Sequence, residues 1–329
     1  MTTYIIRRVA LLFPTMLVVT LVVFFSVRFI PGNVVDAMIA QMSSAASLSQ
    51  LSRASLEHTM GLDVPIPIQY GRWLGVLPED DGQFHGLLEG DLGKSLWAPQ
   101  RVTDLIFQRL PVSLELTAIA VVTALLTSIP LGVYSAIRQD TAGDYVGRSV
   151  SVLFISVPSF WVATMIIIYP AIWWHWSPSL EYMPLSRNPL GNILQFLLPG
   201  FLLGMLLGGT LMRITRTMML EVLRQDYVRT AWAKGLGETR IVSQHVLRNA
   251  LLPVVTVVGV VIPIVIAGTV VIEQIFALPG LGLLLYQSLS NRDYPMISGI
   301  NLFLATVVVI SNLLVDLSYA WLDPRVQYG

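Results

Sequence analysis

Tyr227-Val-Arg-Thr-Ala-Trp-Ala-Lys-Gly-Leu236, which continues through Gly-Glu-Thr-Arg240 to His245-Val-Leu-Arg-Asn249, is a polar and basic segment between two long apolar runs. The apolar runs, Leu190 to Met212 and Ala250 to Ile272, contain no Asp, Glu, Lys or Arg. Each is long enough to cross a hydrocarbon core of about 30 Å as a helix that rises about 1.5 Å per residue. A membrane protein that keeps a charged loop between two such runs is expected to use it to bind a partner.

The composition of the whole chain is that of a membrane protein. Of its 329 residues, 54% are hydrophobic and 12% are charged, whereas soluble domains carry about 25% charged residues. We therefore predict an all-α, polytopic membrane protein with six transmembrane helices. The predicted spans are Val9 to Phe29, Val112 to Tyr134, Ser149 to Ile172, Leu190 to Met212, Ala250 to Ile272 and Ile297 to Ala320.

The distribution of basic residues predicts that both termini face the cytoplasm. This orientation puts seven Lys and Arg residues between Arg213 and Arg248 inside, and it leaves only Arg187 and Arg292 in the short outer loops. A segment as long as the one after the first span translocates largely regardless of charge. The predicted parts are residues 1–30 with the first span, an extracytoplasmic subdomain at 31–111, a five-helix core at 112–320 with a cytoplasmic loop at 213–249, and a cytoplasmic tail at 321–329.

Sequence motifs for catalysis or for binding a metal or nucleotide are missing. The chain has no cysteine, so a Cys-based metal site and a thiol nucleophile are excluded, and its four histidines form no His-Glu-x-x-His pattern. Gly93-Lys94-Ser95 looks like the end of a phosphate-binding loop, but Leu88 stands where the Walker A pattern needs its first glycine. We expect no cofactor bound by this chain, no catalysis and no nucleic-acid partner.

The loop between the fourth and fifth predicted spans combines small and basic residues. Its seven basic and three acidic residues would suit a simple positive-inside anchor. The spacing favours a binding role beyond that of an anchor. A partner would have close access to the backbone around Lys234, because the neighbouring residues are small, namely Ala231, Ala233, Gly235 and Gly237. Basic groups then follow along a helix that leads into the fifth span, at Arg240, His245 and Arg248.

Two acidic residues lie in or near the spans, where an ionisable group is costly and is by default a functional candidate. Glu115 is expected within a turn of the outer N-terminus of the second span, where the helix dipole favours an anion. Asp316 is expected near the inner end of the sixth span, with a basic partner such as Arg325, Arg7 or Arg8. We interpret both acids as structural groups first and as gating candidates second.

An ordered set of motifs along the chain resembles the B-type permease subunit of oligopeptide/dipeptide ABC importers. The importer coupling pattern, Glu-Ala-Ala, three residues, Gly, nine residues, Ile-x-Leu-Pro, aligns with Arg229-Thr-Ala231, Gly235 and His245-x-Leu-Arg248, and several of its positions differ here. Other stretches similar to this family are Arg7-Arg8, Pro31-Gly32, Gly61-Leu62, Gly90-Asp-Leu-Gly93, Leu114-Glu-Leu116, Glu273, Pro279-Gly-Leu-Gly282, Asn291-Arg-Asp-Tyr-Pro295, Asn312 to Asp316 and Asp323-Pro-Arg325.

The resemblance implies a type I ABC importer permease with an extracytoplasmic insertion after its first helix, in the cell membrane of a prokaryote. It implies as partners a second homologous permease subunit, two ABC ATPase subunits that use ATP and Mg, and an extracytoplasmic substrate-binding protein. The cargo would be a peptide, although similar permeases also carry glutathione, nickel chelates and some sugars. Gating or structural roles would fall to Glu115, Glu273, Asp316 and Arg325.

The resemblance also implies that a short helix after Gly235, at about Leu236 to Ser243, docks on an ATPase subunit. The residues expected to couple to the ATPase are Arg229, Thr230, Ala231, Ala233, Lys234, Gly235, Leu236, Gly237, Glu238, Arg240, His245, Leu247 and Arg248. An ion-coupled secondary transporter or a channel is the alternative, and it should carry paired charges near the membrane midplane. The spans contain almost no such charge. A membrane scaffold or export subunit is a third possibility.

Overall fold

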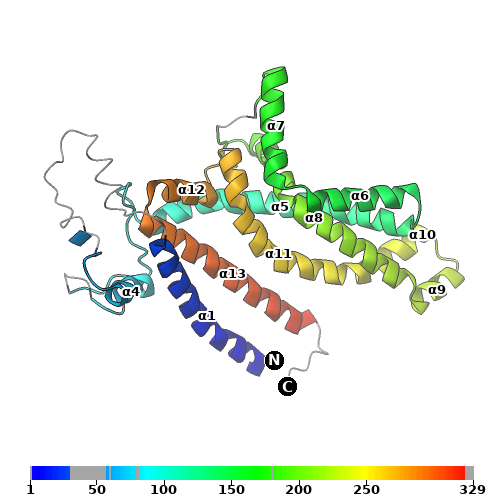
Figure 1. Cartoon of the computed structure of the whole chain (residues 1–329). Coiled ribbons are helices and arrows are strands. Elements are labelled where there is room, and N and C mark those ends of the chain that lie inside the picture. The colour runs from blue at the N-terminus through cyan, green and yellow to red at the C-terminus, as the bar shows by residue number, and fades with distance from the viewer. Residues whose placement is uncertain (1, 30–56, 59–60, 79–81, 179–180, 323–329) are drawn as a thin grey trace. The chain divides into compact units, whose positions relative to one another are not determined.

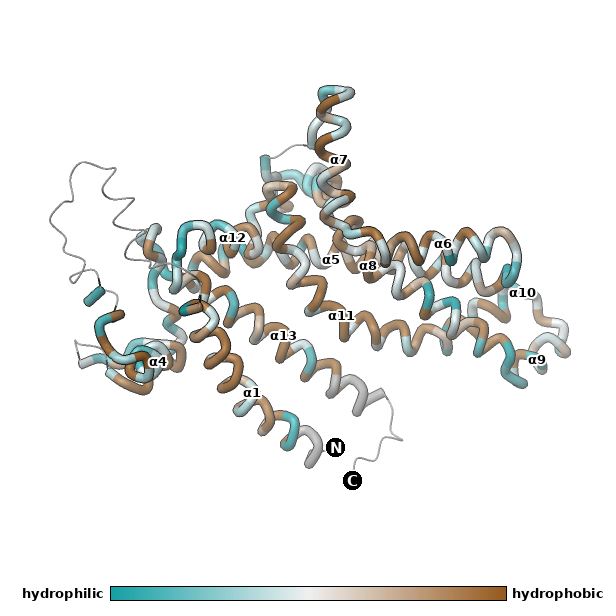
Figure 2. The backbone as a smooth tube through the Cα atoms, viewed as in Figure 1, coloured by the Kyte–Doolittle hydropathy of each residue, from teal (hydrophilic) through white to brown (hydrophobic). Residues whose placement is uncertain are grey.

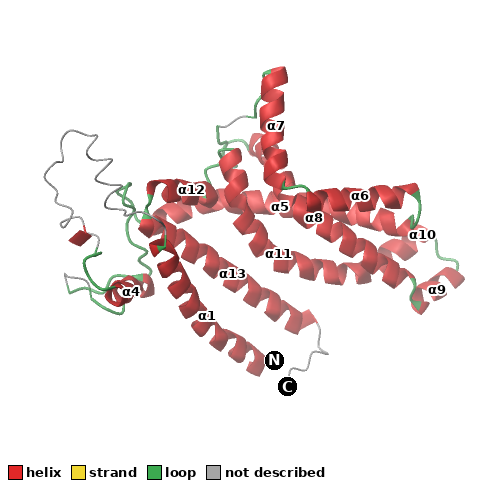
Figure 3. Cartoon of the chain, viewed as in Figure 1, coloured by secondary structure: helices red, strands yellow, loops and turns green. Residues whose placement is uncertain are grey.

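The computed structural model describes residues 2–29, 57–58, 61–78, 82–178 and 181–322. These residues are mainly helical and include no β-strand, as Figure 3 shows. The helices are α1 (Thr2–Arg28), α4 (Ile66–Leu74), α5 (Val102–Ile137), α6 (Ala142–Ser156), α7 (Ser159–Trp174), α8 (Pro189–Leu223), α9 (Asp226–Ala233), α10 (Glu238–Arg240), α11 (Leu247–Ile275), α12 (Leu281–Asn291) and α13 (Tyr294–Leu322). A short 3-10 helix (Leu87–Glu89) and a π-helix (Ile241–Val246) complete the set.

Five helical stretches in the described part of the chain are long and apolar enough to cross a membrane, and a bent pair would make a sixth span. The stretches are Ile6–Arg28, Val102–Ile137, Pro189–Leu223, Glu238–Ile275 and Tyr294–Val315. They coincide with five of the six predicted spans and extend several of them. The prediction of an all-α, multi-pass membrane protein is therefore confirmed.

The third predicted span, Ser149 to Ile172, is not one straight helix. It consists of α6 and α7, which meet at an angle of 90°. The break falls at Val157 and Pro158, because proline has no N–H to donate and clashes with the preceding turn. Proline alone does not decide the outcome, since α8 and α11 continue through Pro199, Pro253 and Pro263.

The chain divides into two compact units, and the first is built around α8. Unit 1 comprises residues 111–283 and 308–329 with Met1, and α8 packs in it against α6, α7 and α11 (Figure 1). The buried side chains at its centre include Phe196, Leu207 and Leu211, each at most 2% exposed. Figure 2 shows the apolar residues along α8 and α11, with more hydrophilic residues at α9.

The glycines of α8 allow neighbouring helices to approach closely, as their four-residue spacing predicts. A Cβ atom on Gly204 would lie 2.4 Å from the carbonyl oxygen of Ala120 in α5. A Cβ on Gly209 would lie 2.8 Å from the carbonyl oxygen of Ser151 in α6, and the Ser151 hydroxyl donates a hydrogen bond to the Gly209 carbonyl. The glycine stripe therefore serves packing within the chain.

Unit 2 comprises residues 2–110 and 284–307, and a buried aspartate organises one part of it. Asp293 is 3% exposed and lies in the turn between α12 and α13. Its carboxylate accepts hydrogen bonds from the Ser95 hydroxyl (2.5 Å) and the Leu96 N–H (3.3 Å). The Trp97 indole N–H donates to the Asn291 carbonyl at 2.8 Å. The segment before α5 is thus held against the turn that precedes α13.

Candidate functional site

The polar segment between α8 and α11 folds into two short helices that we call the helical hairpin, residues 224–246. Helix α9 precedes a turn at Lys234 to Gly237, and α10 and the π-helix then lead into α11. Gly235 has φ +76°, a left-handed conformation that favours glycine, and its N–H donates to the Trp232 carbonyl at 2.9 Å. Figure 1 shows α9 and α10 at the end of unit 1 where α5 turns into α6.

One face of the helical hairpin is a compact hydrophobic core. Val228, Ile241 and Val246 are fully buried and Ala231 is 6% exposed. They pack with residues from the ends of three long helices, namely Ala136 of α5, Met219 of α8 and Ala250 of α11. Burying four such side chains stabilises the hairpin by several kcal/mol at about 25 cal/mol per Å². The hairpin is therefore a firmly seated element of unit 1.

The opposite face of the helical hairpin is exposed and polar. Of the residues that the sequence singled out, Arg229, Thr230, Ala233, Lys234, Gly235, Gly237, Glu238, Arg240 and Arg248 are exposed, and Leu236, His245 and Leu247 are partly buried. Ala231 belongs to the core face instead. Two large aromatic side chains that were not among the predicted site residues, Tyr227 and Trp232, are 44% and 48% exposed. Aromatic residues of this kind are typical anchors of protein interfaces.

The predicted docking helix at about Leu236 to Ser243 differs in detail from the structure. Helix α10 begins at Glu238 and passes directly into the π-helix, which places one extra residue in the turn before α11. The Asn249 amide donates to the Tyr227 hydroxyl at 2.9 Å and to the His245 carbonyl at 3.1 Å. These bonds connect α9 to the start of α11, so both arms of the hairpin are fixed to the same long helix.

A buried ion cluster lies where α5, α6 and α8 meet, and the sequence analysis missed it. The Asp144 side chain is 0% exposed and accepts hydrogen bonds from Arg216 at 2.7 and 2.8 Å. Arg148 also donates to it, at 2.5 and 3.1 Å, as does the Asp140 N–H at 3.0 Å. The Ser135 hydroxyl of α5 is a further donor. The spacing of Asp144 and Arg148 by four residues was the available signal.

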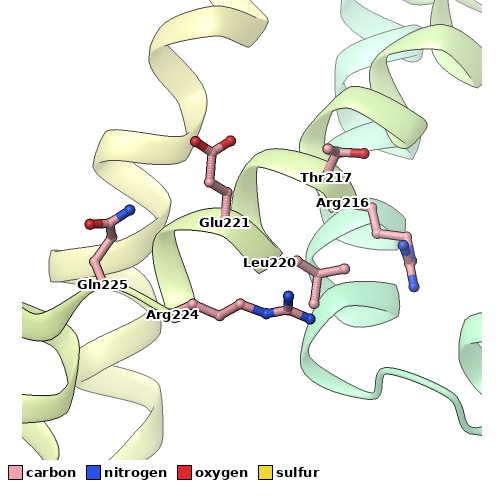
Figure 4. A pocket seen from close by; sticks show the side chains of 6 residues that line it. All are labelled: Arg216, Thr217, Leu220, Glu221, Arg224 and Gln225. Atoms are coloured by element: carbon pink, nitrogen blue, oxygen red, sulfur yellow. The ribbon is translucent and has the colours of Figure 1, made fainter.

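The last turns of α8 line an open cavity of about 450 Å³ next to this cluster. Its lining residues are Arg216, Thr217, Leu220, Glu221, Arg224 and Gln225. Figure 4 shows Arg216, Leu220 and Arg224 on one side of the helix, with Glu221 and Gln225 on the other. The end of α8 therefore presents a hollow, lined by charged, polar and aliphatic residues, immediately before the helical hairpin begins.

Glu273 is a buried structural acid at the end of α11. Its carboxylate is 0% exposed and accepts hydrogen bonds from the Ser113 hydroxyl (2.6 Å) and from the N–H groups of Gly282 (2.7 Å) and Leu283 (3.0 Å). The Ser113 hydroxyl itself accepts from the Leu281 N–H at 2.8 Å. Glu273 thus satisfies the free N–H groups at the first turn of α12, which is where an anion is favoured.

Glu115 does not lie where the sequence analysis expected it. Helix α5 begins at Val102 and not near Val112, so Glu115 is about three and a half turns along the helix. Asn192 of α8, which is fully buried, lies beside its carboxylate, and the Asn192 amide donates to the Met183 carbonyl at 2.8 Å. The dipole at the start of α5 therefore does not stabilise the Glu115 carboxylate. The carboxylate lies instead at a contact between α5 and α8.

The predicted pairing of Asp316 lies outside what the structure describes. Asp316 is part of α13, but its side chain is not described, and Arg325 belongs to residues 323–329, which are not described. Groups of His, Cys, Asp and Glu that could hold a metal ion do not occur among the described residues. The contact that would link Asp316 to Arg325, Arg7 or Arg8 stays a prediction.

The fold and the hairpin define a helical, multi-pass membrane protein, and comparison with known proteins gives its family. The chain belongs to the binding-protein-dependent transport system inner membrane components. The main domain of that family matches residues 128–328, and its N-terminal domain matches residues 1–117. The resemblance to a transport permease is thereby confirmed.

Curated relatives align over the whole length of this chain. A putative peptide transport system permease protein of Brucella abortus is 41% identical over 328 residues, which cover 100% of both chains. The oligopeptide transport system permease protein AppB of Bacillus subtilis is 38% identical, again over 100% of both chains. The dipeptide transport system permease protein DppB of Alkalihalophilus pseudofirmus is 32% identical with the same coverage.

Proposed function

We propose that this chain is one of two permease subunits of an ATP-driven importer and forms half of the translocation pathway for di- or oligopeptides. Support comes from the relatives, which are named as permease proteins of peptide, oligopeptide and dipeptide transport systems. Two ABC ATPase subunits use ATP and Mg, and a substrate-binding protein delivers the peptide. The chain itself is a non-catalytic transport subunit.

The helical hairpin is the element through which the ATPase acts on this chain. The observation that carries this proposal is its two-sided construction, with a buried apolar face on α5, α8 and α11 and an exposed face of small and basic residues. Because Asn249 fastens α9 to α11, a push on the exposed face is transmitted to that long helix. ATP-driven closure of the ATPase dimer would tilt α11 and convert the pathway from inward-open to outward-open.

This role requires the helical hairpin and both termini to lie in the cytoplasm. The basic residues of the hairpin region, seven between Arg213 and Arg248, support that orientation. The segment at 31–111 and the loop from Glu273 to Pro295 then face the opposite side, where they contact the substrate-binding protein. The Asp293 hydrogen bonds hold parts of both segments together within unit 2.

Substitutions at the tip of the helical hairpin test the docking role. Gly237 has no atom within 4 Å of the position that a Cβ would take and has an ordinary φ of −69°. Gly237→Glu is therefore compatible with the fold, whereas Gly235→Glu adds backbone strain at φ +76°. We expect the Gly237→Glu variant to insert into the membrane and to have the same unfolding midpoint as the wild type. It should lose peptide uptake and peptide-stimulated ATP hydrolysis in the reconstituted complex.

A matched control is Glu181→Gln, an exposed site far from the helical hairpin in sequence. It should transport peptide at the wild-type rate. Normal uptake by both Gly235→Glu and Gly237→Glu would refute the docking role. Uptake that persists without any ATPase and depends on an ion gradient would replace the proposal with the ion-coupled alternative.

A further inference from the structure

Helix α4 and the turn that follows it expose apolar side chains that the described residues of unit 2 leave uncovered. Ile66 and Ile68 are 48% and 37% exposed, and the turn that follows α4 exposes Val76 (57%) and Leu77 (39%). Helix α4 has no residue buried in the protein and contains no acidic residue. An exposed apolar face of this kind is normally covered by a partner or a membrane.

The inner face of α4 packs on the membrane-spanning helix α1. The Tyr70 hydroxyl lies 2.9 Å from the Thr20 hydroxyl, and the Tyr70 and Trp73 rings lie 5.1 and 5.7 Å from the Phe24 ring. Arg28, the last residue of α1, donates to Gln69. Figure 1 shows α4 beside the Arg28 end of α1. Thr20 and Phe24 are buried by these contacts, at 4% and 3% exposed.

These contacts set the depth of α4 relative to the bilayer. Arg28 ends the stretch Ile6–Arg28, which is long and apolar enough to span a membrane. Phe24 lies about 6 Å and Thr20 about 12 Å below Arg28 at 1.5 Å per residue. A helix that packs on both residues therefore lies below the level of Arg28. Interfacial helices are buried about 5 to 10 Å into the boundary between headgroups and acyl chains.

The exposed surface of α1 at the same depth is apolar. Val18, Val22, Phe25 and Phe29 form a stripe along α1 with spacings of three and four residues, and each is at least 40% exposed. Tyr70 and Trp73 of α4 pack on Phe24, so the exposed apolar side chains of α4 lie near the same end of α1. The Arg28 guanidinium lies 3.5 Å from the centre of the Phe24 ring and donates to the Phe24 carbonyl at 3.3 Å, which holds in place the side chain that donates to Gln69 of α4.

We propose that α4 is an interfacial helix embedded in the leaflet at the Arg28 end of α1, with lipid acyl chains covering Ile66, Ile68, Val76 and Leu77. The segment at 31–111 is then anchored to the bilayer surface at α4 in addition to its covalent link to α1. The proposal does not depend on the transport role, because it rests only on contacts within unit 2.

Depth measurements by spin labelling test this placement directly, because the chain contains no cysteine. A nitroxide would be attached to Ile68→Cys or Val76→Cys in the full-length chain in lipid nanodiscs. Collision rates with oxygen, which concentrates in acyl chains, and with a water-soluble nickel chelate would then be compared. Val22→Cys on α1 serves as the lipid reference, and Gln100→Cys, an exposed loop site, serves as the water reference.

We expect the ratio of oxygen to nickel collisions at Ile68→Cys and Val76→Cys to be several-fold higher than at Gln100→Cys and close to that at Val22→Cys. A ratio equal to that of Gln100→Cys would place α4 in water and overturn the proposal. Low collision rates with both reagents would show that protein covers α4, which would overturn it as well. Two label sites guard against a local effect of either substitution.

Discussion

Two buried carboxylates of unit 1, Asp144 and Glu273, are both 0% exposed but have different kinds of hydrogen-bond partner. Asp144 pairs with two arginines, and Glu273 accepts hydrogen bonds from one hydroxyl and two backbone N–H groups. Sequence reasoning reached Glu273 through a family motif but not its partner Ser113, which is 160 positions away. Arg216 is 72 positions from Asp144, so no local pattern could reveal that pair.

Asp144→Asn should lower the free energy of unfolding, because it removes the charge that two arginines share. Arg148 and Arg216 are 41% and 17% exposed, so water screens part of the interaction. We expect a loss of about 2 to 3 kcal/mol, between the values for surface and buried pairs. Thermal unfolding in detergent measures it. Asp140→Asn is the matched control, since Asp140 is 65% exposed and should change stability by less than about 1 kcal/mol.

Glu273→Gln should also destabilise the fold, since an amide replaces a carboxylate that accepts three hydrogen bonds. The side-chain NH2 group of the glutamine is a donor, so it could not accept a hydrogen bond from a backbone N–H group. The expected cost is about 1 to 3 kcal/mol, seen as a lower unfolding midpoint. Glu181→Gln, at an exposed position, should leave the midpoint unchanged. An equal midpoint for both variants would contradict the capping role of Glu273.

At the scale of elements, the glycines of α8 are where sequence and structure agree most closely. The four-residue spacing of Gly200, Gly204 and Gly208 is typical of close helix packing, and α5 passes within contact of all three. The structure also ranks these glycines by the space available for a side chain. A Cβ on Gly204 would overlap the backbone of Ala120, whereas a Cβ on Gly208 would meet its nearest atom, the Thr127 hydroxyl, at 3.6 Å.

Gly204→Ala and Gly208→Ala should therefore differ in their effect on the free energy of unfolding. The first forces α5 and α8 apart and should cost about 1 to 3 kcal/mol, as overpacking does. The second fits the available space and should be neutral or stabilise by up to about 1 kcal/mol, because alanine restricts the unfolded chain. The unfolding midpoints of the two variants, measured side by side in one detergent, decide the matter. Equal midpoints would contradict the packing described for α5.

Other elements show which structural features periodicity and composition could not predict. The apolar content of Ser149 to Ile172 predicted one span, but apolarity carries no information on the 90° bend between α6 and α7. The second span was predicted to start at Val112, whereas α5 begins at Val102 and continues through Pro111. The side of the hairpin that Ala231 occupies depends on contacts with Met219 and Ala136, which are set by tertiary packing.

For the whole molecule, composition and span count sufficed to predict a multi-pass membrane protein, and the ordered motifs sufficed for its family. The account of function rests on the helical hairpin, which joins a buried apolar face to an exposed small and basic one. A permease that is driven by separate ATPase subunits needs an element on which they dock, and it needs a separate surface for the binding protein. The central claim is that an ATPase subunit contacts the exposed face of the hairpin.

Site-directed cross-linking of the assembled complex tests that claim most directly. Lys234→Cys places the only thiol of this chain at the exposed tip of the helical hairpin, and Leu185→Cys, 48% exposed in the connection between α7 and α8, is the control. Each variant would be treated in native membranes with a thiol-anchored photo-cross-linker, and the products identified by mass spectrometry. We predict that Lys234→Cys captures an ATPase subunit and that Leu185→Cys does not. Capture of the substrate-binding protein from Lys234→Cys, or of no ATPase at all, would contradict the account.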